Sequence, residues 1–392
     1  MWPMMGQILM PNREPIERVL FRKTIEDDLR LDATIYSQWT VMFSQKTTET
    51  RIPLLALNRV LKAVREAIAS GSVTERIIFC ILVLSAKPLE PTLINDLGHD
   101  LFQPPAPQAG YINHIGTVEC HTEHIDVLRR LILERGGIST IKTPSLPEHF
   151  QYIDLLDASQ RVIPPAFEFC FSYRYVLENE LAACRLPLSL ADAFPVDKSF
   201  KEIILDLRHC CQILDELCND PLGPNYMALP YRMLPTYREI VHHRLLNLPI
   251  GHPESEICRL AVLIFSYGVT LPLPNPRPIN SVTQQLRETL ATPYYTETQD
   301  RGLLFWAAML GAMASFNYNY TAEEDLHVFF LDRLRVLATE LGLGSWDAAR
   351  ALLGKFVWLS RACDDGGRYV WENLFADHAY AGVVARFPQL AI

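Results

Sequence analysis

The stretch "ECHTEH" gathers five side chains that can bind a metal ion: Glu119, Cys120, His121, Glu123 and His124. If the stretch opens a helix, Cys120 and His124 share one face, and so do His121 and His124. A closed zinc site needs four ligands, and apart from His114 no cluster is spaced to supply the rest. We therefore interpret Cys120, His121 and His124 as weak metal candidates. The expected structure is the solvated first turn of a helix, with no metal or other cofactor.

A second acidic group is "CDDGG", from Cys363 to Gly367. It is similar to the aspartate-rich start of helical terpene cyclases, where carboxylates hold magnesium. Those enzymes need further carboxylates one helical turn later, whereas here Gly366 and Gly367 follow the acidic pair. Because glycine is unfavourable inside helices, we expect this stretch to end a helix.

Cysteine and histidine also occur together in "HCC" at 209–211 and "HH" at 242–243. A nucleophile and its base must meet in space, and the Leu- and Ile-rich surroundings of Cys210 and Cys211 favour core packing instead. The sequence contains no nucleophile elbow, P-loop, dinucleotide fingerprint or zinc-protease motif. It therefore predicts no catalytic residue, and we do not expect an enzyme.

Composition narrows the class of protein further. The chain has 392 residues, 49% of them hydrophobic, and a formal net charge of −9, which is typical of a globular protein. No run of basic residues is present, so direct DNA binding is disfavoured. The nine cysteines include no C-x-x-C pair and are expected to be reduced and mostly buried. The longest apolar run, 302–316, is shorter than the ~20 residues that span a bilayer, and no secretory signal is expected.

The elements that would position these residues are almost all helical. Residues 1–50 have little pattern and are expected to form an N-terminal arm, while 51–392 are expected to form one helical domain. Apolar residues recur at helical spacing in the first long segment, and we expect this row to face the core: Leu54, Leu57, Leu61, Val64 and Ile68. A second row, Ile125, Leu128 and Ile132, ends at Gly136 and Gly137, which can adopt the positive φ that closes helices. The predicted fold is all-α, an elongated assembly of antiparallel helices.

Aromatic residues are concentrated in the C-terminal helical segments, where we expect them to pack the core: Phe305, Trp306, Phe330, Trp346, Phe356 and Trp358. Such a set is more often packing than the lining of a ligand pocket, although a ligand cavity between helices remains an alternative.

Four segments, in order, resemble the regulatory domain of fungal transcription factors of the binuclear zinc cluster class. They are "VLRRLILERGGISTI" followed by "FQYIDLLDASQ", then "YREIVHHRLLNLP", then "CRLAVLIFSYGVTLPLPNPRPI", and finally "GLLFWAAMLGAMAS" with "FFLDRLRVLATELGLGSWDAARALLGKFVW". Together they cover roughly residues 52–375. The resemblance implies an all-helical domain that controls or dimerises a transcription factor, and a nuclear location.

One part of that family pattern is missing. The DNA-binding module of the family is an N-terminal cluster of six cysteines, whereas the first cysteine here is Cys80. The resemblance therefore implies a regulator that acts through protein partners, self-association or a small ligand, rather than by reading DNA itself. Two alternatives stay open: a helical enzyme of a fungal biosynthetic pathway, and a scaffold that binds another protein through an exposed apolar helix face. Outside the nucleus, the expected location is the cytoplasm.

Overall fold

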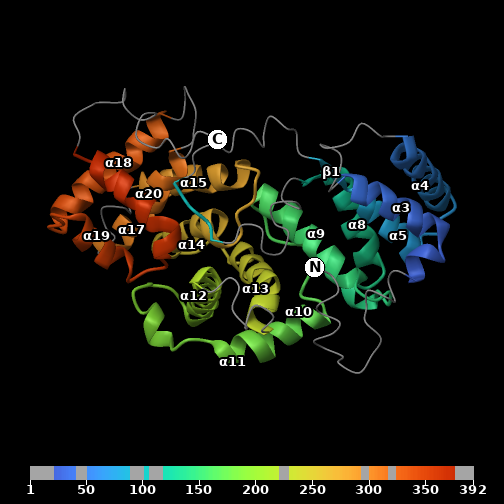
Figure 1. The fold of residues 1–392 in the computed structure, drawn as a ribbon, viewed down its shortest axis with the longest axis horizontal. Helices are drawn as coiled ribbons and strands as arrows, with labels where there is room; N and C mark the ends of the chain where they lie inside the picture. Colours follow the sequence, from blue (N-terminus) through green and yellow to red (C-terminus); the bar gives the residue numbers. More distant parts are fainter. Residues whose placement is uncertain are drawn as a thin grey trace. The chain divides into compact units, whose positions relative to one another are not determined.

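The computed structural model describes residues 22–40, 51–88, 101–105, 118–219, 229–292, 300–316 and 324–375 (Figure 1). The prediction of an all-α fold is confirmed. Within the described residues there are fifteen α-helices and a single pair of short antiparallel strands, β1 (Ala86–Pro88) and β2 (Val118–Cys120). No described helix has both the length and the apolar character needed to cross a membrane.

The chain divides into two compact units that do not follow a boundary at residue 50. Unit 1 consists of Met1–Ile94 and Gln108–Ala183, and unit 2 of Asn95–Pro107 and Cys184–Ile392. Within the expected N-terminal arm, residues 1–21 and 41–50 lie outside the described part. The rest of it includes a helix, α3, that packs in unit 1.

Unit 1 is built around an apolar central helix. Its helices are α3 (Asp28–Gln38), α4 (Arg51–Ala69), α5 (Glu75–Leu84), α8 (Thr122–Glu134), α9 (Leu146–Arg161) and α10 (Phe171–Tyr175). The sequence of α5, "ERIIFCILVL", is apolar on nearly every side, and the helix contacts α3, α4, α8 and α9. The row Ile125, Leu128 and Ile132 of α8 is buried as predicted. Gly136 and Gly137 follow it with φ of 97° and 91°.

Helix α4 contradicts the prediction about its core face. Its buried side chains are Pro53, Ala56, Val60 and Val64. Of the predicted row only Val64 is buried, whereas Leu57 and Leu61 are half-buried, and Leu54 and Ile68 are exposed. Because α4 packs closely against α3, the smaller side chains are the ones that fit into the contact.

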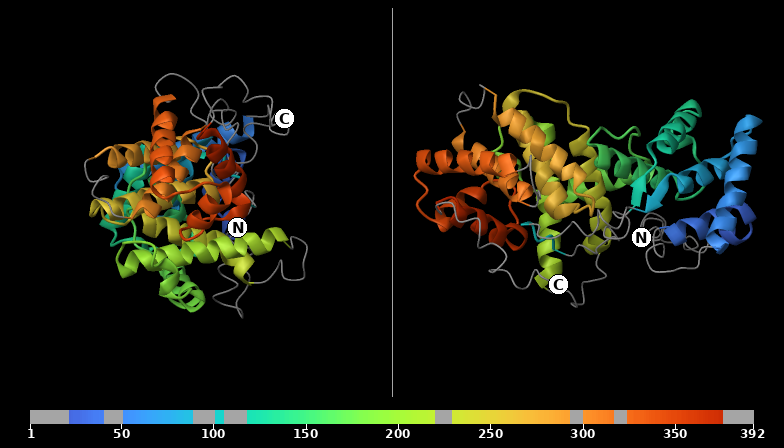
Figure 2. Two further views of the ribbon diagram at one scale, coloured as in Figure 1. Left: turned by 90° about the vertical axis from the view of Figure 1, so that its left-hand side faces the viewer. Right: turned by 90° about the horizontal axis from the view of Figure 1, so that it is seen from above.

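Unit 2 surrounds a fully buried helix, α17. Its helices are α12 (Lys198–Asn219), α13 (Leu229–Leu246), α14 (Pro253–Phe265), α15 (Arg277–Leu290), α17 (Arg301–Ser315), α18 (Glu324–Glu340), α19 (Trp346–Leu353) and α20 (Ser360–Asn373). The short helix α11 (Ala182–Cys184) includes the position in the sequence at which unit 1 ends and unit 2 resumes. Helix α17 contacts α14, α15, α18, α19 and α20, whose arrangement is visible in Figures 1 and 2. Its sequence contains no charge after Arg301, which suits a helix buried on all sides.

Five of the six aromatic residues predicted to pack the core of unit 2 are buried, whereas Trp358 is half-buried. Trp306 stacks on Phe356 with ring centroids 5.3 Å apart, and the edge of Phe194 meets both rings. The indole N–H of Trp306 donates a hydrogen bond of 3.0 Å to the carbonyl of Val357. Phe305 and Phe330 are fully buried. These rings fill the interior of unit 2.

The expectation that "CDDGG" ends a helix is wrong, because this stretch lies in the middle of α20. Both glycines are needed for close packing. A Cβ at Gly366 would collide with the carbonyl of Leu101, and a Cβ at Gly367 would lie 2.8 Å from Trp346 and 2.9 Å from Trp358. The backbone N–H of Gln103 also donates a hydrogen bond of 2.8 Å to the carbonyl of Ala362. Segment 101–105 therefore lies directly against the glycine face of α20.

Candidate functional site

The metal candidates of the opening stretch do not share a helix face. Cys120 belongs to strand β2, His121 is the N-cap residue, and α8 begins only at Thr122. The backbone N–H of Cys120 donates to Gln160 Oε1 at 3.3 Å. Burial, followed by the charge of Asp157, raises the pKa of the Cys120 thiol, so the thiolate that a metal requires is disfavoured.

The two histidines have structural contacts of their own. His124 Nδ1–H donates to the carbonyl of Leu84 at 2.8 Å, which joins α8 to the end of α5. The rings of His121 and His124 lie 5.2 Å apart. Within the described residues, no three His, Cys, Asp or Glu side chains form a group that could hold a metal ion, and His114 lies outside them. In this part of the chain, the geometry gives the three candidates no further ligands.

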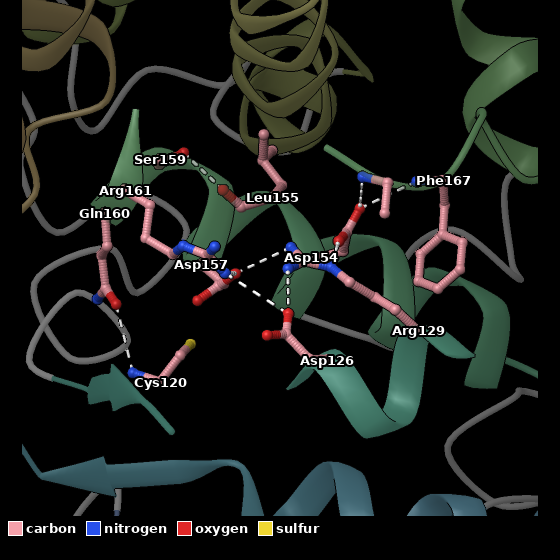
Figure 3. Close-up of polar contacts among 11 residues, drawn as sticks. Cys120, Asp126, Arg129, Asp154, Leu155, Asp157, Ser159, Gln160, Arg161 and Phe167 are labelled. Atoms are coloured by element: carbon pink, nitrogen blue, oxygen red, sulfur yellow. Dashed lines mark hydrogen bonds and ion pairs between the residues drawn. The ribbon is translucent and has the colours of Figure 1, made fainter. Parts of the chain in front are cut away.

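A buried charged network joins α8 to α9 (Figure 3). The Arg129 guanidinium lies between the two helices, with Nε 2.7 Å from Asp154 Oδ1 and Nη2 2.9 Å from Asp157 Oδ2. Arg161 also contacts Asp157 at 3.2 Å, and Asp126 contacts Arg129 at 3.3 Å. Sequence reasoning missed this network because its partners come from separate helices. The spacing of Asp154 and Asp157 by three residues was the signal that could have suggested a shared face.

The network is suited to holding the helices rather than to acid–base chemistry. The second oxygen of Asp154 accepts hydrogen bonds from the backbone N–H groups of Ala166 and Phe167, at 2.8 Å and 3.1 Å. Burial raises the pKa of Asp154 and of Asp157, although Arg129 opposes that shift. Burial would lower the pKa of Arg129, but the two carboxylates outweigh burial and the pKa is raised. Because both oxygens of Asp154 are engaged by protein groups, this carboxylate is committed to structure.

The cysteine and histidine candidates of unit 2 lie in its interior. Cys210 and Cys211 are buried, and burial raises the pKa of both thiols. His242 is fully buried, with Nδ1 hydrogen-bonded to Ser266 Oγ at 2.9 Å and its ring 4.7 Å from Tyr267. Ser266 belongs to a π-helical turn, Ser266–Thr270, a kind of turn that occurs often at functional sites.

The His242–Ser266 pair has the residue types of a base and a nucleophile, but not their properties. Burial lowers the pKa of His242 to about 3, so its affinity for protons is too low for a base at neutral pH. No hydrogen-bond partner orients His242 Nε2 within the described part of the chain. Both side chains are shielded from solvent. The sequence did not suggest this pair, because α13 and the turn are brought together only by folding.

One carboxylate of the acidic pair of α20, that of Asp364, also serves packing. Asp364 accepts a hydrogen bond from the Trp358 indole N–H at 2.8 Å and another from Arg350 Nε at 2.6 Å. The preceding residue, Cys363, is buried. The carboxylate that the sequence offered as a magnesium ligand thus fixes α20 to α19 and to the turn between them.

The feature best suited to an intermolecular role is the outer face of α4. Leu54 is 46% exposed and Ile68 is 53% exposed, and half-buried Leu57 and Leu61 lie between them along the helix. We call these four side chains the α4 apolar row. Helix α4 lies at the periphery of unit 1 in Figures 1 and 2, with α3 and α5 on its inner side. The row is interrupted between Leu61 and Ile68, where Val64 is buried and Arg65 is exposed. Exposed apolar side chains at helical spacing on one face are still more informative than the same residues scattered singly.

Positive charge borders the α4 apolar row. Arg65 lies four residues after Leu61 and makes no ion pair within the described residues. Lys62 makes only an exposed contact of 4.0 Å with Glu66. Arg59, in contrast, is bound to Asp32 of α3 by two hydrogen bonds of 2.7 and 2.5 Å. The outer edge of α4 is therefore cationic although the chain as a whole is acidic.

Comparison of the chain with protein-family models, curated proteins and solved structures gave no significant match.

Proposed function

We propose that the protein is a transcription-regulator-like protein that acts through contacts with other proteins and has no DNA-reading module of its own. The proposal rests on the four sequence segments that resemble the regulatory domain of fungal binuclear zinc cluster transcription factors. A contact within the first of these segments is consistent with it: Arg129 in "VLRRL" binds Asp154 and Asp157 in "YIDLLDAS". These three charged residues, which belong to the segment that resembles the family, therefore hold two helices of the fold together.

The structural observation that supports a partner-binding role is the α4 apolar row. A protein that works through partners needs a solvent-exposed apolar surface whose burial stabilises the complex, and about 25 cal/mol per Å² is gained by such burial. Leu54 and Ile68 provide exposed apolar area at the two ends of the row. The net charge of −9 opposes direct binding to the DNA backbone. By the same proposal the protein works in the nucleus, where its partner supplies the DNA contact.

An enzymatic role has less support. The residues with catalytic chemistry, His242 and Ser266, lie in the interior, and the Asp154 carboxylate is occupied by Arg129 and by backbone N–H groups. The α4 apolar row has no catalytic chemistry. A binding role therefore accounts for more of the structure than a catalytic one.

The first test of the proposal measures DNA binding and the oligomeric state together. A fluorescent mixed-sequence duplex at low salt should not bind the purified protein, and light scattering on a sizing column should give one discrete species. Tight, salt-sensitive binding of the duplex would contradict a partner-dependent regulator.

The second test measures regulation directly. The full chain is fused to an unrelated DNA-binding domain and directed to a reporter promoter in a fungal host cell. Reporter output should change relative to the DNA-binding domain alone, and the paired substitution L54S and I68S should abolish the change. The matched control is V328S with V336S, two exposed apolar residues of α18 in unit 2. Equal output from the wild-type and the α4 variant would remove α4 from the proposed function.

A further inference from the structure

We propose that the α4 apolar row binds an acidic amphipathic helix of another protein. This inference rests on the proposed function, because it names the chemistry of the partner for the same surface. It follows from the geometry of the row, the sign of its flanking charges and the consequence of those charges for self-association.

The row has the form that an α-helix would bind. Leu54, Leu57, Leu61 and Ile68 are separated by three, four and seven residues, which places them along one line of the helix surface. At 1.5 Å per residue the row is about 21 Å long, equal to roughly four turns of a partner helix. A single line of side chains fits into the groove beside one ridge of another helix.

The charges beside the row select an acidic partner. Arg65 and Lys62 lie on the solvent side of the row, and Lys62 is 79% exposed. Glu66 is the only acidic residue of α4, and its side chain contacts Lys62 at 4.0 Å. An exposed pair of this kind contributes little energy, so Lys62 can exchange Glu66 for a partner carboxylate. Glutamate or aspartate beside the apolar residues of a partner helix would therefore meet two cations.

The same charges disfavour a second copy of this chain. In a two-fold antiparallel pair of α4 helices centred on Leu61, the Lys62 side chains of the two copies would lie beside each other. Like charges that face each other across an interface are destabilising. The row therefore fits a different molecule better than itself. An anionic lipid surface shares the charge preference, but α4 has no aromatic residue that would anchor it in a membrane interface.

The test uses two synthetic helical peptides of about four turns, labelled with fluorescein. Both carry leucine at positions that match the row, and the flanking positions are glutamate in one peptide and lysine in the other. Anisotropy titration with the full chain should give a dissociation constant on the order of 10 µM for the glutamate peptide, as is usual for a small interface. Binding of the lysine peptide should be at least tenfold weaker.

Variants of α4 locate the site. L54S with I68S should weaken binding of the glutamate peptide at least tenfold. K62E with R65E should reverse the preference, so that the lysine peptide binds more tightly than the glutamate peptide. The matched control is R130E, a charge reversal at an exposed arginine of α8 in the same unit. Circular dichroism and melting confirm that each variant is folded. A reversed preference in K62E with R65E is a gain of binding that loss of folding would not produce.

The outcomes separate this inference from the proposed function. If both peptides bound with equal affinity, and L54S with I68S weakened both, the inference of an acidic partner would be wrong, but α4 would still be a contact surface. The inference would also be wrong if neither peptide bound. It would be wrong as well if the protein bound only to vesicles of phosphatidylserine and phosphatidylcholine and this binding depended on Arg65. The reporter experiment with L54S and I68S decides the proposed function independently of these results.

Discussion

Arg129 on α8 and Asp154 on α9 are joined by a charged hydrogen bond of 2.7 Å, with side chains that are 11% and 2% exposed. Removing one member of a buried ion pair typically costs about 3–5 kcal/mol, because the other charge is left without compensation. R129M should therefore destabilise unit 1 by about that amount at pH 7.5, measured by urea unfolding. R130M, at the neighbouring exposed arginine, should change stability by about 0.5 kcal/mol or less.

The cost of R129M should become smaller in acid. Burial raises the pKa of Asp154 and Asp157, and Arg129 lowers them, so removal of Arg129 raises both pKa values further. A carboxyl with a raised pKa in the folded state favours folding below its unfolded pKa and loses that contribution as pH rises through the folded pKa. The difference in the free energy of unfolding between wild-type and R129M should therefore become smaller as the pH is lowered from 7.5 to 5. A constant difference would mean that the two carboxylates stay charged.

His242 should make unit 2 sensitive to acid. Burial, with a smaller effect of His243, lowers the pKa of His242 from 6.5 to about 3. The unfolded chain therefore binds a proton that the folded chain does not, and stability present above the unfolded pKa is lost as pH falls toward the folded pKa. Each such group contributes a slope of about 1.4 kcal/mol per pH unit. In H242Q, the plot of the free energy of unfolding against pH should therefore have a slope between pH 6 and pH 4 that is smaller by about that amount.

A companion variant checks the origin of the slope. Burial lowers the pKa of His327 to about 4, so H327Q should change the slope in the same direction over a shorter interval of pH. If both variants kept the wild-type slope, the acid sensitivity would have to come from other groups.

Gly366 should not tolerate a side chain. A Cβ at this position meets the carbonyl and Cβ of Leu101, and backbone does not move aside as the end of a flexible side chain would. Overpacking of this kind costs about 1–3 kcal/mol or more, so G366A should lower the melting temperature although alanine favours helices. G354A is the control, because the nearest atom to its new Cβ is 3.5 Å away. A melting temperature for G366A at or above that of wild-type would mean that segment 101–105 does not lie against α20.

The buried carboxylate of Asp206 on α12 should be another point of sensitivity. It accepts hydrogen bonds of 2.9 and 3.0 Å from Arg185 and one of 2.5 Å from Arg244 on α13. D206N keeps the shape but removes the carboxylate that both arginines share and leaves Arg185 with Glu202 at 3.4 Å, so a loss of about 3 kcal/mol is expected in urea unfolding. The control is D215N, because the 3.2 Å pair of Asp215 with Arg361 is exposed and should contribute about 1 kcal/mol or less.

Helical periodicity was sufficient to predict the fold class and the core face of α8. The row Ile125, Leu128 and Ile132 is buried, and the glycines after it have positive φ. These features depend on neighbours within a few residues. They could be predicted because local spacing and capping chemistry determine them.

Features that depend on distant partners could not be predicted in the same way. In α4, two apolar rows compete for the core, and hydrophobicity alone favoured the larger residues. The contact with α3 selected the row that contains Ala56, with Ala33 of α3 equally buried. Gly366 looked like a helix end because the reason for it, Leu101, is far away in the sequence. The charged network of Arg129 and the pair of His242 with Ser266 likewise join residues from separate helices.

The contact between Leu101 and Gly366 also has a consequence for biosynthesis. Segment 101–105 belongs to unit 2, yet it leaves the ribosome long before α20 does. At about 5–20 residues per second, its partner helix is synthesised on the order of ten to fifty seconds later. During that interval Phe102, which is buried against Gly268 in the finished protein, has no completed surface to cover it. In a nascent chain of this protein, Phe102 therefore stays without its final contacts until the helices of unit 2 have been synthesised.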